Sequence, residues 1–134
     1  MLEFTGLNWL AILVATVAGF ALGGIWYGPL FGDTWLAALG KTADQIQPSP
    51  TPFIISFFTS LITAVVLALL INALNISTLG GGVVIGLLVG IGFIATAMAS
   101  DSAFGDTGLT LWLIQSGYRA LYSVLMGAIL AVWR

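Results

Sequence analysis

The residue of this sequence best placed to do chemistry is Arg119, an arginine deep inside the last apolar segment of the chain. Further polar side chains follow at helical spacing of three or four residues, so one face of a helix would be polar. Hydrocarbon offers hydrogen-bonding groups no partner, so this face must turn toward protein, water or a ligand. The candidate ligand-binding residues are Arg119, Gln115, Ser116 and Tyr122 on this segment and Thr63 on the second apolar segment.

Two interpretations of Arg119 stay open. An arginine near the middle of a bilayer costs from about 3 to over 10 kcal/mol, depending on how far water and the membrane surface can reach it. The acidic residues all fall at or outside the ends of the apolar segments, so we expect no carboxylate at this depth. In the first interpretation Arg119 lies in a wet cavity, where it attracts an anion, a lipid headgroup or a polar solute. In the second it bonds hydroxyls and carbonyls, or reaches toward the surface, with a purely structural role.

The composition is that of a membrane protein. The 134 residues are 60% hydrophobic and 6% charged, and the mean hydropathy of +1.13 lies outside the usual range of soluble domains. Three basic residues cannot neutralise enough phosphates to support nucleic-acid binding. Because the chain has no Cys and no His, it lacks the thiol nucleophile, the usual general base and the common zinc and haem ligands. We therefore expect no enzyme, no metal site and no cofactor.

One acidic pair could suggest catalysis. Asp101 and Asp106 are close in sequence and lie after the third apolar segment. Paired carboxylates can serve as general acid and base, but here no His, Cys or cluster of metal ligands accompanies them. Residues of this kind are typical of turns and helix caps. We expect both in a short turn between the third and fourth segments.

Four apolar segments are each long enough, at 1.5 Å per residue, to cross the roughly 30 Å hydrocarbon layer. They cover about residues 7–28, 53–74, 79–100 and 108–133. The predicted fold class is all-α: one polytopic domain over residues 1–134 with four transmembrane helices. The first segment lacks a preceding basic region, which favours a retained span over a cleaved signal peptide.

The connection over residues 31–52 is predicted to contain a short helix lying in the membrane interface. Asp33 or Thr34 is the expected N-cap. The alternating prolines from Pro48 to Pro52 predict an extended spacer before the second span. The apolar residues at helical spacing in this connection are Trp35, Leu39, Ala43 and Ile46.

Small residues recur every four positions on the apolar segments, a pattern that lets neighbouring helices approach closely. The third segment has the strongest signal, with two overlapping GxxxG steps, and Gly92, Thr96 and Ser100 follow on a neighbouring line. A four-helix bundle uses such faces internally, so they do not by themselves establish an oligomer. The predicted packing positions are Gly19, Gly23, Ser60, Ala64, Gly82, Gly86, Gly90 and Gly127.

Motifs spread over nearly the whole chain resemble those of the bacterial membrane family catalogued as domain of unknown function 1761. The resemblance implies a compact protein of four transmembrane helices without an established biochemical role. It also implies a polar position at Arg119, where family members often have His. The motifs are Asn8-Trp9-Leu10, Gly23 with Trp26-Tyr27-Gly28-Pro29-Leu30-Phe31-Gly32 and Trp35, Gly92-Phe93, Gly117-Tyr118, and Met126-Gly127-Ala128-Ile129-Leu130.

The sequence thus predicts a small, self-associating integral membrane protein with an anion, lipid-headgroup or polar-solute site at Arg119. The alternative is a non-catalytic assembly or accessory subunit of a larger membrane complex. The expected partners are the lipid bilayer and either further copies of the chain or another membrane protein. We expect a multi-pass protein of the bacterial inner (cytoplasmic) membrane. An even number of spans places both termini on one side, and Arg134 there favours the cytoplasm, although Lys41 on the other side balances the count.

Overall fold

The computed structural model describes residues 2–46 and 49–134, and every regular element within these ranges is a helix. The predicted all-α class is therefore confirmed for the described part of the chain. Seven of the elements are α1 (Trp9–Ile25), the π-helix η1 (Trp26–Leu30), α2 (Gly32–Leu39), the 3₁₀-helix η2 (Ala43–Gln45), α3 (Thr51–Ala73), α4 (Leu79–Leu87) and the π-helix η3 (Leu88–Ala95). The last two are α5 (Thr96–Gly105) and α6 (Leu109–Val132).

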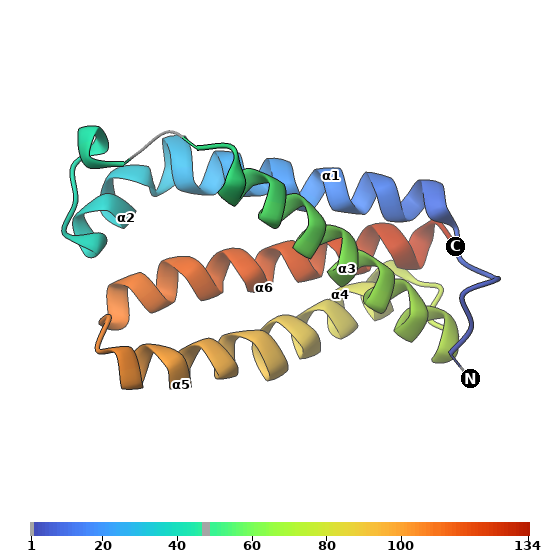
Figure 1. The fold of residues 1–134 in the computed structure, drawn as a ribbon. Coiled ribbons are helices and arrows are strands. Elements are labelled where there is room, and N and C mark those ends of the chain that lie inside the picture. Colours follow the sequence, from blue (N-terminus) through green and yellow to red (C-terminus); the bar gives the residue numbers. More distant parts are fainter. Residues whose placement is uncertain (1, 47–48) are drawn as a thin grey trace.

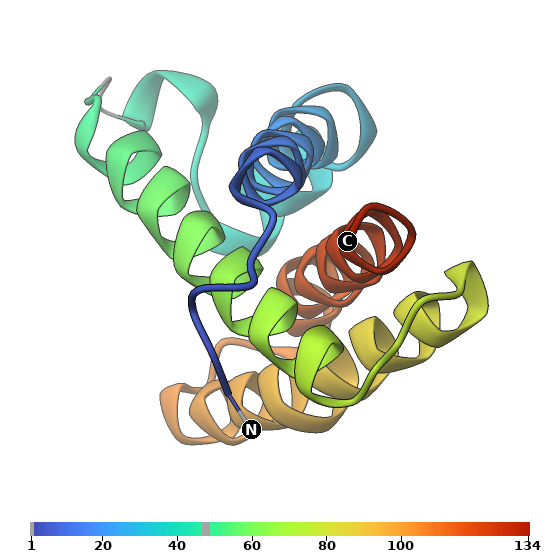
Figure 2. The ribbon, with the colours of Figure 1, turned by 90° about the vertical axis from the view of Figure 1, so that its right-hand side faces the viewer.

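Three helical stretches are long and apolar enough to cross a membrane: Trp9–Leu30, Thr51–Ala73 and Leu79–Gly105. The helix α6 has a similar length of 24 residues, but its polar residues, Gln115 and Arg119 among them, lower its hydropathy. Figure 1 shows α1, α6 and the α4-to-α5 stretch running side by side, with α3 crossing them obliquely. Seen along the bundle, α6 lies between α1, α3 and α4 and packs on all three (Figure 2). The most polar of the long helices is therefore the central one.

The core lies where α1, α3 and α6 meet. Its largest fully buried side chains include Ile12 from α1, Leu67 and Ile71 from α3, and Tyr122 and Met126 from α6. Lipid tails are as apolar as these side chains, so inside a bilayer the close packing of helix on helix stabilises the fold more than the removal of apolar surface from water does.

Glycines bring α4 and η3 into contact with the backbone of α6. A Cβ atom added to Gly86 would lie 2.5 Å from the carbonyl oxygen of Ser123, and one added to Gly90 would lie 2.8 Å from Cα of Ala120. Gly82 and Gly127 face each other so closely that a Cβ on either would collide with the carbonyl oxygen of the other. No larger residue fits at these positions without moving a helix.

The other predicted packing positions face the interior of the bundle. A Cβ atom on Gly19 would lie 2.6 Å from Cε of Met126, and one on Gly23 would lie 2.9 Å from the Tyr118 hydroxyl oxygen. Ser60 and Ala64 of α3 are both fully buried. The Ser60 hydroxyl has no hydrogen-bond partner within the described residues, so Ser60 contributes to packing through its small size.

The short helix after the first span differs from its prediction. It ends at Leu39, because Gly40 adopts a left-handed conformation with φ of 72°, so Ala43 and Ile46 lie outside it. It begins at Gly32, which places Asp33 and Thr34 inside the first turn, and no side chain caps it. A single glycine with positive φ thus divides what the apolar spacing read as one helix.

The proline run is also not an extended spacer. Pro50 is the N-cap residue of α3, and the helix begins at Thr51 with Pro52 in its first turn. A proline is tolerated there because the first N–H groups of a helix have no intrahelical acceptor to lose. Pro48 lies outside the described residues.

Two spans end later in the chain than predicted, and the third is also longer. The first continues through Gly28 and Pro29 as η1 and ends at Leu30. The third continues to Gly105, so Asp101 lies within α5 and not in a turn. Asp106 is the turn residue: its left-handed φ of 53° ends α5. The helices therefore run further toward one end of the bundle than hydropathy alone indicates.

Candidate functional site

The guanidinium group of Arg119 lies against two tyrosine rings of its own helix. Its central carbon is 5.1 Å from the ring centroid of Tyr118 and 5.1 Å from that of Tyr122. Both are within cation–π range. The side chain is half-buried, and none of the residues that the structure describes gives it a carboxylate partner. The positive charge therefore contacts aromatic ring faces in place of a counter-ion.

Both rings are fixed by their hydroxyl groups. Tyr118 donates a hydrogen bond of 2.9 Å to the carbonyl oxygen of Gly19 in α1. Tyr122 donates one of 2.8 Å to Oγ1 of Thr63 in α3. The two side chains are 5% and 1% exposed. Each ring is thus anchored to a different helix, and the surface on which Arg119 rests is preorganised.

The aromatic contacts continue from α6 to the connection after the first span. The ring of Tyr27 lies 5.5 Å from that of Tyr118 and 5.1 Å from that of Trp35, both edge to face. A Cβ atom on Gly32 would lie 2.7 Å from the carbonyl oxygen of Tyr27, so α2 folds tightly against η1. The sequence interpretation assigned Trp35 to a surface helix, but the side chain contributes to the support of the Arg119 site.

The remaining candidate residues differ in the hydrogen bonds that they form. Thr63 accepts from Tyr122 and donates at 2.9 Å to the carbonyl oxygen of Thr59. Ser116 is buried and donates at 2.6 Å to the carbonyl oxygen of Trp112 in its own helix. Gln115 lies one turn before Arg119, half-buried, and the described residues give its amide no hydrogen-bond partner. The structure therefore brings Arg119, Tyr122 and Thr63 together and leaves Gln115 and Arg119 as the two candidate residues with unused bonding capacity. The buried indole N–H of Trp35 also has no partner among the described residues.

Indole groups hold the same half of α6 from two sides. Trp26 in η1 donates at 2.9 Å to the carbonyl oxygen of Ile114. Trp112 donates at 3.0 Å to the carbonyl oxygen of Ala95, at the junction of η3 and α5. A change from π- to α-helical bonding frees backbone groups, and π-helical turns often occur at functional sites. The first half of α6 is thus flanked by two π-helical segments.

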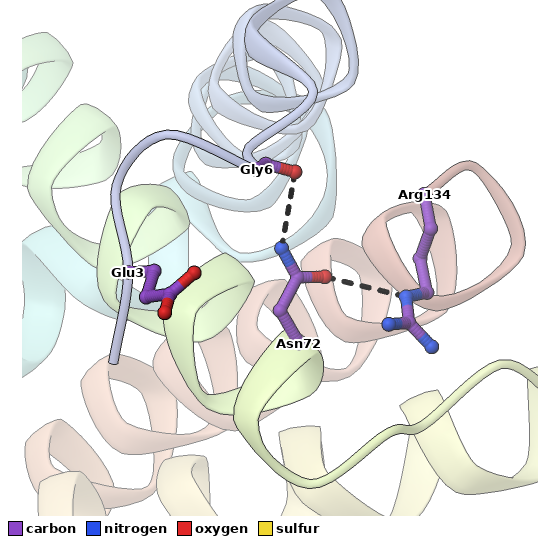
Figure 3. Close-up of a pocket in the computed structure, with 4 residues that line it drawn as sticks. All are labelled: Glu3, Gly6, Asn72 and Arg134. Atoms are coloured by element: carbon purple, nitrogen blue, oxygen red, sulfur yellow. Dashed lines mark hydrogen bonds between the residues drawn. The ribbon is translucent and has the colours of Figure 1, made fainter. Parts of the chain in front are cut away.

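Two hollows of about 400 Å³ each lie at opposite ends of the bundle, and neither is lined by Arg119. Figure 3 shows the first, between Glu3, Gly6, Asn72 and Arg134. There Asn72 donates at 3.4 Å to the carbonyl oxygen of Gly6, and Arg134 donates at 3.3 Å from Nε to Oδ1 of Asn72. These bonds tie both ends of the chain to the end of α3. The second hollow lies at the turn from α5 to α6.

No group of three or more Asp or Glu side chains in the described ranges is arranged to hold a metal ion. The sequence reasoning did not select Tyr118, although it carries half of the cation–π contact. That reasoning considered only residues three or four positions from Arg119, so it passed over Tyr118, the residue directly before it in the chain. A search for aromatic residues adjacent to the buried charge would have found it.

These features define an all-helical protein in which three apolar helices of membrane-spanning length surround a more polar central helix. Residues 10–131 match the model of a family described as protein of unknown function (DUF1761), and the chain belongs to this family. No curated protein and no solved structure matches it.

Proposed function

We propose that this chain is a four-span integral membrane protein that binds an anion, a lipid headgroup or a polar solute at Arg119. The helix α6 would be the fourth span: its 24 residues correspond to roughly 36 Å at 1.5 Å per residue. Its central position supports this assignment, since α1, α3 and α4 all pack on it. The proposed location is the bacterial inner membrane, with both termini cytoplasmic. The proposed role is binding without catalysis.

The observation that carries the proposal is the bonding state of Arg119. Its central carbon lies over the rings of Tyr118 and Tyr122, and a cation–π contact of this kind uses none of the five N–H donors for a hydrogen bond. The neighbouring hydroxyls of Tyr118, Tyr122 and Ser116 already donate to protein oxygens. At low dielectric, unused donors on a charged group are costly, and an acceptor-rich ligand would remove that cost.

The first test compares the chain with its Arg119→Gln variant. A ligand that binds only the folded state raises the unfolding temperature, and the increase grows with the logarithm of its concentration above Kd. We expect one class among inorganic anions, anionic lipids and polar solutes to stabilise the original chain by several degrees and the variant by less than one degree. Liposome flux of the same solutes then separates binding from transport. Equal responses, with altered assembly in the variant, would leave Arg119 a structural role only.

A second candidate function is that of an assembly or accessory subunit. Gly92, Thr96 and Ser100 form a line of small residues on the exposed side of η3 and α5, unlike the glycines that pack against α6. Such a line favours close approach of another transmembrane helix. Gly92→Leu should lower the detergent-corrected mass of the purified particle or release a co-purifying protein. If both stay unchanged, this candidate is wrong.

A further inference from the structure

Besides the buried indole N–H of Trp35, two residues on one face of α6 carry donors without a partner among the described residues. Gln115 and Arg119 are one helical turn apart and share this face with Tyr122. Tyr122 bonds Thr63 of α3, so the face points toward α3. The guanidinium and the amide together present a line of N–H donors along the helix. A group with several acceptor oxygens and negative charge matches this line better than a neutral solute does.

These donors lie closer to one membrane surface than the position of Arg119 suggests. Gln115 is six residues after Leu109, or roughly 9 Å along the axis, and Arg119 is roughly 15 Å along it. Long helical side chains lean toward the helix N-terminus, which moves the guanidinium further in that direction. Figure 1 shows the start of α6 at the same end as α2 and the end of α5, opposite both termini.

On the side of the bundle that these donors face, the start of α3 is exposed, although α2 contacts α6 at this end. The first five residues of α3 are all exposed, whereas Ser60 and Ala64 further along are fully buried. Figure 2 shows the start of α3 lying away from α6. Phe53 is 66% and Phe58 56% exposed, as expected for side chains covered by acyl chains. A ligand reaching Arg119 from this side would pass along hydrocarbon.

We propose, on the basis of the Arg119 site, that its ligand is the phosphate oxyanion of an anionic phospholipid from the leaflet next to α2. The lipid's tails stay in the bilayer beside α3 while its phosphate reaches the donors of Gln115 and Arg119. Arg119 lines neither of the two hollows described above, and a free anion would have to leave its water to reach this depth. A lipid carries its own apolar part and needs only a local thinning of the membrane.

The experiment uses native mass spectrometry of the purified full chain with phosphatidylglycerol, diacylglycerol or inorganic phosphate. Diacylglycerol has the same tails without phosphate, and inorganic phosphate has the same oxyanion without tails. We expect phosphatidylglycerol to form at least five times more adduct than diacylglycerol. Arg119→Gln should reduce this adduct at least fivefold and Arg119→Lys should restore part of it. The matched control Arg134→Gln removes an arginine whose donors already bond Asn72 and Ile76, and it should change the adduct less than twofold.

Two outcomes would overturn the proposal in distinguishable ways. Arg119-dependent binding of inorganic phosphate without retention of phosphatidylglycerol would exclude the lipid and leave the proposed anion site in place. Equal phosphatidylglycerol adducts for Arg119→Gln and Arg134→Gln would exclude Arg119 as the lipid site. If Arg119→Gln does not fold, the comparison of phosphatidylglycerol with diacylglycerol on the original chain still tests the proposal. Equal amounts of the two adducts would contradict it.

Discussion

Tyr122 uses the two parts of its side chain for different partners. Its ring lies under the guanidinium of Arg119 at 5.1 Å, and its hydroxyl bonds Thr63 of α3 at 2.8 Å. Removing the hydroxyl alone therefore tests the link between α6 and α3 without removing the aromatic surface. The separation matters because loss of the whole ring would also leave a cavity in the core.

Tyr122→Phe should lower the free energy of unfolding by about 1 kcal/mol, the usual net value of one hydrogen bond. Inside membranes such bonds average closer to about 0.6 kcal/mol. The free energy can be measured by reversible unfolding in mixed detergent. Thr63→Val removes the same bond from the other side, so the two changes together should cost less than the sum of their separate effects. Strict additivity would show that the bond contributes nothing.

The sequence located the residues of this site better than it located their bonds. Helical spacing predicted one face of α6 with Arg119 and Tyr122, and depth in the membrane alone selected Thr63. It could not show that Ser116 bonds the backbone of its own helix, because a serine in a helix has its own carbonyls within reach as well as a neighbour's side chains. The contribution of Trp35 depends on how α2 folds back, which no local pattern encodes.

The contact of α4 and η3 with α6 depends on what glycine lacks. Helix backbones approach closely where no Cβ intervenes, and close approach increases the van der Waals contact that replaces the hydrophobic effect in a bilayer. Gly86 lies against the backbone of Ser123 and Val124. Gly80 lies on the same helix with no atom within 4 Å of an added Cβ, so the two positions form a matched pair.

Gly86→Ala should destabilise the fold by about 1 to 3 kcal/mol, the range found for overpacking in tightly packed cores. Gly80→Ala should be neutral or slightly stabilising, since alanine is the better helix former. Unfolding of both variants in mixed detergent, with helix content as the readout, checks the difference. If the two alanine variants have equal stability, the predicted close approach at Gly86 is wrong.

Element positions follow from the sequence where one physical rule dominates and fail where two rules compete. Hydropathy indicated the apolar stretches, and spacing of small residues indicated Gly82, Gly86 and Gly90 as contact positions. The connection was misread because apolar spacing continues past Gly40, whose backbone conformation ends α2. Neither π-helix was predicted, since the hydrogen-bonding pattern of η1 and η3 depends on backbone geometry, which their residue types do not indicate.

At the level of the whole molecule, the polarity of α6 accounts for its central position, where the other long helices cover part of its surface. A helix with Gln115 and Arg119 inserts poorly alone, but the other long helices bury its Tyr118 and Tyr122 face. Hydropathy of single helices therefore gives three candidate spans, and the proposed fourth depends on the bundle around it. Whether α6 crosses the membrane decides on which side the chain ends.

Four spans place the turn from α3 to α4 and the C-terminus on one side of the membrane, opposite the α2 connection and the turn from α5 to α6. The chain has no cysteine, so single cysteines can be introduced without background. We expect Ser77→Cys and Arg134→Cys to react with a membrane-impermeant maleimide only after the cells are opened, which would also place both termini in the cytoplasm. Lys41→Cys and Thr107→Cys should react in intact cells.

All four positions are exposed, so a lack of reaction reports sidedness and not burial. Reaction of Arg134→Cys and Thr107→Cys from the same side would mean that α6 does not cross.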